Sequence, residues 1–159
     1  MARTATGESF WFYSGPRLEK QEVRARDGKT WKKGQPMVLD SGLWEPVASN
    51  GTKIHGLAAE NVDTSTSSSD VFVNKIMSTS TKLAGRLSYE DSDYQAKKSQ
   101  IGLNRGVYVG SNLATVDYID DTNAAVVIRD VGWDLEPLQN DSDDTPMWVT
   151  FTCKASALE

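Results

Sequence analysis

The chain has 159 residues, of which 38% are hydrophobic and 25% charged, and its formal net charge is −5. This composition is that of a globular protein large enough to bury a core. The acidic balance argues against nucleic acid as a partner, because phosphate contacts require a basic excess. No apolar run approaches the roughly 20 residues of a membrane span, and residues 1–6 lack the apolar core of a secretion signal. We therefore expect no membrane partner.

The inventory of reactive side chains argues against catalysis. His55 and Cys153 are the only histidine and the only cysteine. A His-Cys metal centre needs more ligands than these, and a Ser-His-Asp triad would have to use His55, in a stretch with the pattern of a strand. No glycine-rich phosphate loop is present. We predict that the protein is not an enzyme and holds no cofactor or metal. The single cysteine also indicates synthesis in a reducing cytoplasm.

Two acidic clusters could still bind Ca²⁺ or supply an acid–base pair. Their members are Asp117, Asp120 and Asp121 in one cluster, and Asp141, Asp143 and Asp144 in the other. Both clusters lie in turn-forming sequence, and neither has the central glycine and distal glutamate of a calcium loop. The favoured interpretation is that both are solvated turns.

The first predicted element in chain order is an N-terminal arm, residues 1–26. It carries four consecutive aromatic residues, Phe10-Trp11-Phe12-Tyr13. In a strand, Phe10 and Phe12 would lie on one face, and Trp11 and Tyr13 on the other. Two apolar faces fit an ordinary first strand in the chain's own core. They equally fit a segment that docks on a partner, where Trp and Tyr are frequent hot spots and an extended arm can add a strand to a sheet.

Residues 27–66 have the pattern of β-hairpins. The turn signals are Asp27-Gly28, Asp40-Ser41-Gly42 and Asn50-Gly51, and they separate short strands predicted at 36–39, 43–47 and 54–59. A Ser/Thr run over 64–69 follows. This run is typical of an exposed connection, and it is the best candidate for a boundary between two lobes.

Residues 67–159 contain further short strands and one predicted helix. We expect strands at 71–73, 83–89, 107–109, 113–119, 124–131 and 148–154. Ser92 and Gln95 match a capping box, which predicts a short helix over 93–101. The fold class expected is mainly β, with a hairpin lobe followed by a barrel or sandwich lobe that includes one short helix.

Parts of this pattern resemble a known family. The stretch 27–47, DGKTWKKGQPMVLDSGLWEPV, followed by IHGLAAE at 54–60, resembles the capsid decoration (cement) proteins of tailed bacteriophages. The stretches 102–108, 115–117 and 125–128 are similar to the barrel half of such proteins. The resemblance covers most of residues 27–154 and includes no catalytic signature. It implies a β-tulip-like lobe over 27–66 and a barrel-like lobe over 67–159.

The resemblance also implies a function. Such a protein binds the outside of the icosahedral capsid as a homotrimer and stabilises the expanded head by bridging subunits of the major capsid protein. It would be made in the host cytoplasm and reside on the outer capsid surface of the virion. The candidate residues for contact with the capsid or a neighbouring protomer are Phe10, Trp11, Phe12, Tyr13, Trp31 and Trp44.

Two alternatives remain open on the sequence. One is a carbohydrate-binding or adhesin-type β module, in which Trp31, Trp44, Trp133 and Trp148 would form a sugar platform, although such tryptophans more often pack in cores or between subunits. The other is a different head or tail protein of the same class of virion, which copy number would distinguish. A small enzyme is the least favoured interpretation.

Overall fold

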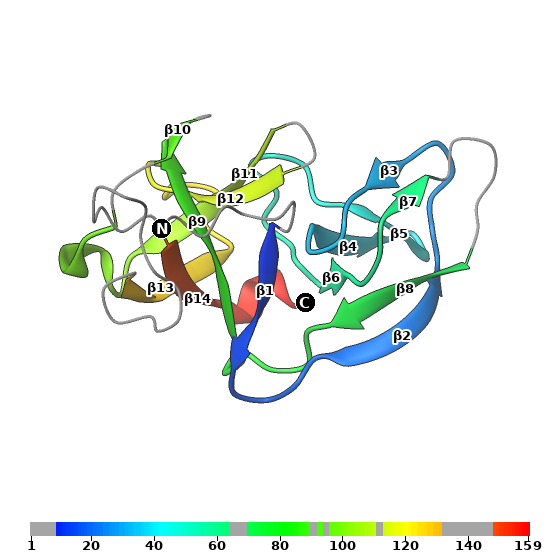
Figure 1. Cartoon of the computed structure of the whole chain (residues 1–159), viewed down its shortest axis with the longest axis horizontal. Coiled ribbons are helices and arrows are strands. Elements are labelled where there is room, and N and C mark those ends of the chain that lie inside the picture. The colour runs from blue at the N-terminus through cyan, green and yellow to red at the C-terminus, as the bar shows by residue number, and fades with distance from the viewer. Residues whose placement is uncertain (1–8, 64–69, 90–91, 94–95, 111–112, 132–147) are drawn as a thin grey trace, which may run out of the picture.

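A computed structural model describes residues 9–63, 70–89, 92–93, 96–110, 113–131 and 148–159. The described chain is mainly β (Figure 1). Its strands form a seven-stranded sheet, a five-stranded sheet and a two-stranded ribbon. The fold class predicted from the sequence is therefore confirmed at the level of a mainly β protein with a barrel.

The larger sheet closes into a five-stranded barrel in the order β9-β12-β11-β13-β14, with β14 pairing back onto β9. The strands are β9 (Lys82–Tyr89), β11 (Asn104–Gly110), β12 (Leu113–Asp117), β13 (Val126–Val131) and β14 (Trp148–Cys153). The β9–β12 pair is parallel, and the other pairs are antiparallel. Closure leaves these strands without an open edge, which is where strands otherwise pair with foreign chains.

Alternation along β9 and β14 fills the barrel. Leu83 and Leu87 from β9 lie in the same apolar cluster as Val149, Phe151 and Cys153 from β14. These side chains are spaced by two or four residues, which places them on one face of each strand. Burying them removes large apolar side chains from water, at roughly 1.5–3 kcal/mol for each of the larger ones.

The outer face of β14 is also buried, because side chains of neighbouring strands lie across it. The hydroxyl of Thr150 donates to Asp130 Oδ2 at 3.0 Å, and Lys82 Nζ contacts the same oxygen at 3.1 Å. Arg129 Nε donates to the hydroxyl of Thr152 at 2.9 Å. All six residues of β14 are consequently buried.

The first strand, β1 (Phe10–Ser14), pairs antiparallel with β9. It is an edge strand of the larger sheet and is not one of the five strands that close the barrel. Its alternation is as predicted. Phe10 lies in the main core, with its ring centroid 4.8 Å from that of Phe151, whereas Trp11 and Tyr13 pack against a separate cluster of Ala84 and Trp148. The backbone N–H of Phe10 also donates to Gly34 O at 3.1 Å, which ties β1 to the turn that leads into the five-stranded sheet.

The five-stranded sheet has the order β2-β8-β6-β4-β5. Its strands are β2 (Glu19–Arg24), β4 (Pro36–Asp40), β5 (Leu43–Pro46), β6 (Gly56–Ala58) and β8 (Asp70–Lys75). The hairpin between β4 and β5 turns through Ser41 and Gly42, whose φ values of 53° and 81° suit the tight turn expected at Asp40-Ser41-Gly42. The sheet is curled, and an isolated bridge between Ala25, which follows β2, and Trp44 in β5 connects its two edge strands.

Arg26 holds this joint between the two margins. Its backbone N–H donates to Trp44 O at 2.9 Å. Its guanidinium contacts Asp40 Oδ2 at 3.1 Å and Glu45 Oε2 at 2.7 Å. The three contacts fix the β4–β5 hairpin against the end of β2.

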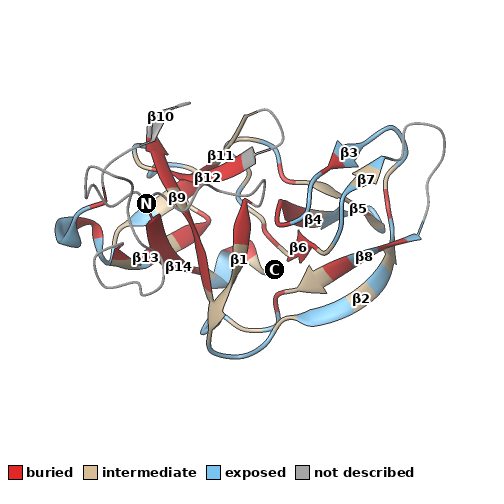
Figure 2. Cartoon of the chain, in the orientation of Figure 1, coloured by how far each residue is buried: buried red, intermediate tan, exposed pale blue. Residues whose placement is uncertain are grey.

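The ribbon of β3 (Thr30–Trp31) and β7 (Val62–Asp63) packs against this curled sheet, since Val62 lies against the same apolar cluster as Met37 and Trp44. Trp31 lies with Met37, Trp44 and Val73 in a second apolar cluster. The two sheets nevertheless share the larger core, because Ile54 and Leu57 belong to the same cluster as the barrel interior. Figure 2 shows this buried zone running from the barrel strands towards β6.

The structure corrects the helix predicted over 93–101. Ser92 and Asp93 form a short strand, β10 (Ser92–Asp93), which pairs with β9. Residues 94–95, including the expected N3 position Gln95, lie outside the described residues. Only a single turn of 3₁₀ helix, η1 (Lys98–Gln100), follows. A helix cannot begin at Asp93, because Asp93 also belongs to β10 and is extended, whereas the residue that follows an N-cap must be helical.

The structure also contains a strand that was not expected from the sequence. β2 pairs along its whole length with β8, from Glu19 opposite Lys75 to Arg24 opposite Asp70. The five-stranded sheet therefore takes strands from all three predicted segments, 1–26, 27–66 and 67–159. Among the described residues the helical turns are η1 and η3 (Ala155–Ala157), with three residues each, and no helix there has the length of a bilayer span.

Candidate interaction surface

His55 has a structural environment. Its Nδ1 accepts a hydrogen bond from the Leu39 N–H at 2.9 Å, and its Nε2 lies 2.8 Å from the main-chain oxygen of Glu159. The imidazole ring also meets the Trp44 ring edge-on at 6.3 Å between centroids. Both ring nitrogens are thus engaged within the chain, and no serine hydroxyl is hydrogen-bonded to either of them among the described residues.

Cys153, by contrast with His55, is buried among apolar side chains. The side chain is 3% exposed in the main core, and this burial raises the pKa of the thiol from an ordinary value of 9.0 to about 12. A reactive cysteine needs a lowered pKa and access to solvent. Cys153 has neither, so it serves as a small core side chain.

The first acidic cluster forms turns. Asp117 Oδ1 accepts from the Ile119 N–H at 3.1 Å, and Asp120 Oδ1 accepts from the backbone N–H groups of Thr122 and Asn123 at 3.1 and 2.9 Å. These are Asx turns, in which the carboxylates satisfy local backbone donors. In the described chain no three His, Cys, Asp or Glu side chains gather as a metal site would need. The second cluster, Asp141, Asp143 and Asp144, lies outside the described residues.

The predicted interface residues divide into two groups. Phe10, Trp31 and Trp44 are 1%, 2% and 5% exposed, so their rings are committed to the chain's own cores. Trp11, Phe12 and Tyr13 are half-buried. The aromatic run therefore contributes one core side chain and three that still face outward in part. Sequence alone could not separate them, because the separation depends on which strand β1 pairs with.

Trp11 and Tyr13 lie on the outside of the barrel, beside Ala84 and Trp148. The Trp11 and Trp148 rings meet edge-on at 5.1 Å between centroids, and the guanidinium of Arg86 lies 5.2 Å from the centroid of the Trp148 ring. Edge-to-face aromatic pairs and cation–π contacts of this kind hold their side chains in fixed orientations. The exposed parts of Trp11 and Tyr13 are therefore held in fixed orientations by the packed side chains beneath them.

On the other face of β1, the guanidinium carbon of the exposed Arg17 lies 6.0 Å from the centroid of the Phe12 ring. We define the β1 surface as the partly exposed side chains on the two faces of this strand, with Trp11, Tyr13 and Arg86 on one face and Phe12 and Arg17 on the other. The two arginines were missed by sequence reasoning. The alternation of residues 83–89 could have placed Arg86 outward, but only the β1–β9 pairing brings it to the aromatic residues.

β1 differs in composition from β2, the other long strand at a sheet margin. Four of the six residues of β2 are charged and exposed, namely Glu19, Lys20, Glu22 and Arg24. β1, with the sequence FWFYS, has no charged residue. Charged side chains on an edge strand discourage pairing and adhesion, and an uncharged aromatic edge lacks that protection. Figure 2 shows the same contrast, with β1 largely intermediate in burial and β2 largely exposed.

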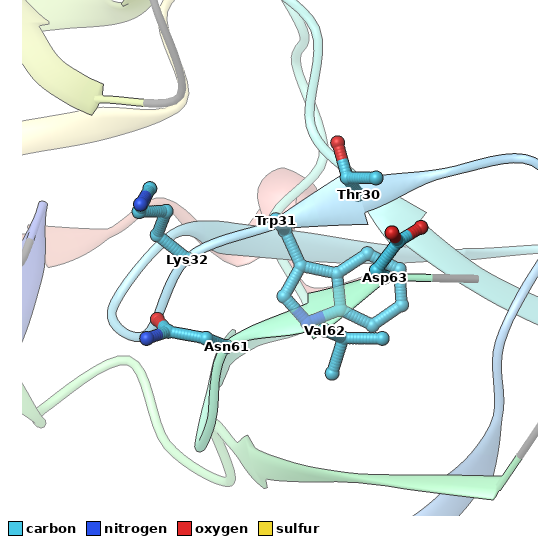
Figure 3. Close-up of a pocket in the computed structure, with 6 residues that line it drawn as sticks. All are labelled: Thr30, Trp31, Lys32, Asn61, Val62 and Asp63. Carbon is cyan, nitrogen blue, oxygen red and sulfur yellow. The ribbon is translucent and has the colours of Figure 1, made fainter. Parts of the chain in front are cut away.

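A pocket of about 390 Å³ lies at the β3–β7 ribbon (Figure 3). Its lining residues are Thr30, Trp31, Lys32, Asn61, Val62 and Asp63. Trp31 and Val62 are directly opposite in the ribbon, and the indole lies against Val62. Because the Trp31 ring is buried in this way, it offers no free face on which a sugar could stack.

The burial of Trp44 and Trp148 removes two more of the tryptophans that could have formed a sugar platform. Trp133 lies outside the described residues, and Trp11 is half-buried against Trp148. Among the aromatic residues that the sequence singled out and the structure describes, those of the β1 surface are therefore the ones that still face outward in part.

The chain was compared with known proteins at three levels, and no protein-family model, no curated protein and no solved structure matches it.

Proposed function

We propose that this chain is a capsid decoration protein of a tailed bacteriophage. It binds the outside of the icosahedral capsid as a homotrimer, bridges subunits of the major capsid protein and so stabilises the expanded head. In this proposal residues 27–66, which supply β4, β5 and β6 of the curled sheet, are the β-tulip-like lobe. The β1 surface contacts the capsid or a neighbouring protomer.

The observation that carries the proposal is the character of β1. Three consecutive aromatic side chains are half-exposed on an uncharged marginal strand, and one of them rests on a packed Trp–Arg base. Aromatic and arginine side chains dominate the binding energy of protein interfaces, and pre-ordered ones lose little entropy on binding. A surface of this composition supports adhesion to another protein.

The placement of the reactive side chains supports a structural role over a catalytic one. The only histidine uses both ring nitrogens within the chain, and the only cysteine is a neutral thiol in the core. The commonest general base and the strongest nucleophile are thereby both occupied.

A trimer would allow modest contacts to hold a shell together. Three linked copies of one weak contact raise the effective local concentration, so overall affinity rises without new chemistry. Cyclic symmetry makes each protomer contact heterologous and ring-closing.

The test is binding to expanded, undecorated heads of the phage that encodes the chain. Purified protein is mixed with heads, the heads are sedimented, and bound copies are counted by gel densitometry, while the mass in solution is measured by analytical ultracentrifugation. We expect a trimer in solution and saturation at a fixed multiple of three copies, in large excess over the dozen expected of a connector.

A pair of variants locates the contact. Trp11→Ser combined with Tyr13→Ser removes the outer aromatic groups of β1 and is expected to weaken head binding by at least about thirtyfold, since the loss of even one hot-spot side chain costs about 2 kcal/mol. Phe72→Ser is the matched control, because Phe72 is an exposed aromatic side chain on β8. Circular dichroism establishes that both variants are folded.

A monomer that does not bind heads would overturn the proposal. A glycan array would then test the carbohydrate-binding alternative. Binding at about a dozen copies would indicate a connector or other head-completion protein instead.

A further inference from the structure

The connection between β5 and β6 contains a pair of residues with covalent chemistry of its own, Asn50-Gly51. An asparagine followed by glycine cyclises readily, because glycine has no side chain to hinder the attack of its main-chain nitrogen on the asparagine carboxamide. The sequence contains no other Asn-Gly pair. Asn50 is also exposed, so water has access to it.

In the folded chain this pair lies in a tight turn. The Gly51 N–H donates to Ala48 O at 2.9 Å, and the φ of Asn50 is 66°. A positive φ at the third position alone is the signature of a type II turn, which favours glycine or asparagine there. A Cβ on residue 51 would lie 2.6 Å from Val47 Cγ1, so the fourth position requires glycine. The local geometry therefore favours this labile pair at 50–51.

The turn is attached to the barrel through β11. The Asn50 N–H donates to Val107 O at 3.0 Å. The Ser49 hydroxyl donates to Val109 O at 3.0 Å and accepts from the Val109 N–H at 2.7 Å. Figure 1 shows this connection reaching from the curled sheet to the barrel. Residues 49 and 50 are thus held by hydrogen bonds to a different sheet.

The same conformation prevents cyclisation. The Gly51 nitrogen must reach Asn50 Cγ, so it must be nearly eclipsed with Asn50 Cβ about the Cα–C bond. In a type II turn the ψ of the third residue is about 0°, which places the nitrogen about 120° away from Cβ. The attacking nitrogen must also lose its proton, and that N–H is bonded to Ala48 O. Ring closure therefore requires the turn to open.

We propose that Asn50-Gly51 is a deamidation site that the turn, attached to β11, keeps closed in the folded chain and that unfolding opens. Isoaspartate at position 50 then marks chains that have been unfolded. This inference concerns the chain alone and holds whatever partner the β1 surface binds.

The reaction needs only water. In the open turn the Gly51 nitrogen gives its proton to solvent and forms a bond to Asn50 Cγ, and the Cγ–Nδ2 bond breaks to release ammonia. Water then adds to one of the two carbonyl carbons of the succinimide and breaks the bond from that carbon to the ring nitrogen. Addition at Cγ gives aspartate, and addition at the main-chain carbon gives isoaspartate.

Isoaspartate would keep the turn from closing again. The main chain of residue 50 would then run through Cβ and Cγ, which lengthens it by one carbon. The N–H groups of residues 50 and 51 could no longer reach Val107 O and Ala48 O together. The modification is therefore a one-way consequence of opening.

The experiment compares the full chain in native buffer with the same chain unfolded in guanidinium chloride, at the same mildly alkaline pH and temperature. Peptide mapping by mass spectrometry follows asparagine, aspartate and isoaspartate at position 50. We expect conversion to be at least about tenfold slower in the folded chain, because the reaction follows the population of the open turn. Asn123-Ala124, a pair without glycine, is the internal control and should react slowly in both samples.

A pair of variants tests the attachment to β11. Ser49→Ala removes both bonds to Val109 and leaves the reacting residues in place. Its conversion in native buffer should be about threefold faster than that of the wild type or more, whereas the two rates in guanidinium chloride should agree. Ser99→Ala is the matched control, because Ser99 is an exposed serine in η1, and it should follow the wild type in both conditions.

Equal rates of conversion in the folded and unfolded chain would overturn the proposal. So would an unfolded chain without isoaspartate at position 50, or a folded Ser49→Ala variant that reacts no faster than the wild type. If that variant does not fold, the comparison of folded and unfolded wild type decides the question by itself.

Discussion

Cys153 lies on the inner face of β14, and its chemistry follows from that position. Burial raises the pKa of the thiol to about 12, so at neutral pH the folded chain holds it as a neutral group. A low-polarity environment disfavours the thiolate, which is the form that reacts with alkylating agents and disulfides. We expect no modification by iodoacetamide at pH 8 in the folded protein and complete modification after unfolding in guanidinium chloride, as measured by mass spectrometry.

The same burial sets the dependence of stability on alkaline pH. The folded-state pKa of Cys153 is above the unfolded value, so its contribution to stability is fully present below about pH 9 and is lost as pH rises towards 12. Cys153→Ala removes this titration while keeping the small apolar side chain. The free energy of unfolding should therefore fall more steeply between pH 9 and pH 11 in the wild type than in the variant, and parallel curves would contradict the assignment.

At the scale of elements, the close packing of β1 on β9 depends on a contact between Phe10 and Gly85. The two residues are opposite in the β1–β9 pair, and a methyl group on Gly85 would overlap Cδ1 of Phe10 and lie 2.7 Å from its Cε1. Gly85→Ala must therefore displace the Phe10 ring from the core. We expect a loss of about 1–3 kcal/mol in the free energy of unfolding, measured by urea denaturation.

A double-mutant cycle tests this explanation. Phe10→Leu narrows the side chain that the new methyl group meets, so the two substitutions should cost less together than the sum of their separate costs. Additive costs would mean that the glycine is needed for some reason other than the ring.

The sequence was informative where a strand has one buried face. Alternation at Phe10–Tyr13, in 83–89 and in 148–154 placed these strands, and Asp40-Ser41-Gly42 placed a turn. β2 was missed because its buried alternation is slight, with only Gln21 and Val23 turned partly inward between exposed charges. The helix over 93–101 was predicted from a local capping pattern, but residues 92–93 instead form a local hairpin with the end of β9, with Ser92 opposite Tyr89.

The sequence predicted which types of residue make up the candidate site, but it did not predict how these residues are arranged in space. Four aromatic residues in a row indicated either a core strand or an interface, and the structure uses Phe10 for the core and leaves three aromatic side chains partly outward. Arg17 and Arg86 could not be assigned, since one lies after the strand and the other reaches the site through a pairing more than seventy positions away. Trp31 and Trp44, isolated tryptophans in the predicted hairpins, were candidates beside Trp11, and the structure separates them from it by burying their rings.

At the scale of the whole molecule, the barrel and the curled sheet share one core. Ile54 and Leu57, beside and within the curled sheet, belong to the same buried cluster as Phe10, Leu87 and Phe151. We expect a single cooperative unfolding transition, with tryptophan fluorescence and far-UV circular dichroism coinciding in urea. Ile54→Ala should lower the free energy of unfolding by about 2–5 kcal/mol and keep one transition, whereas Leu39→Ala, on an exposed side chain, should cost far less.

The closure of the barrel also constrains the order in which the chain can fold. β9 receives β1 from the start of the chain and β14 from near its end, and the parallel β9–β12 pair requires a crossover through β10 and β11. Contacts of such long sequence separation form slowly, because the chain loses the conformational entropy of closing large loops before the contacts can stabilise it. During synthesis, β9 leaves the ribosome long before β14 exists. The curled sheet, completed by β8, is therefore the part that can form first, while the barrel remains an open sheet with an exposed apolar face until translation has passed residue 153.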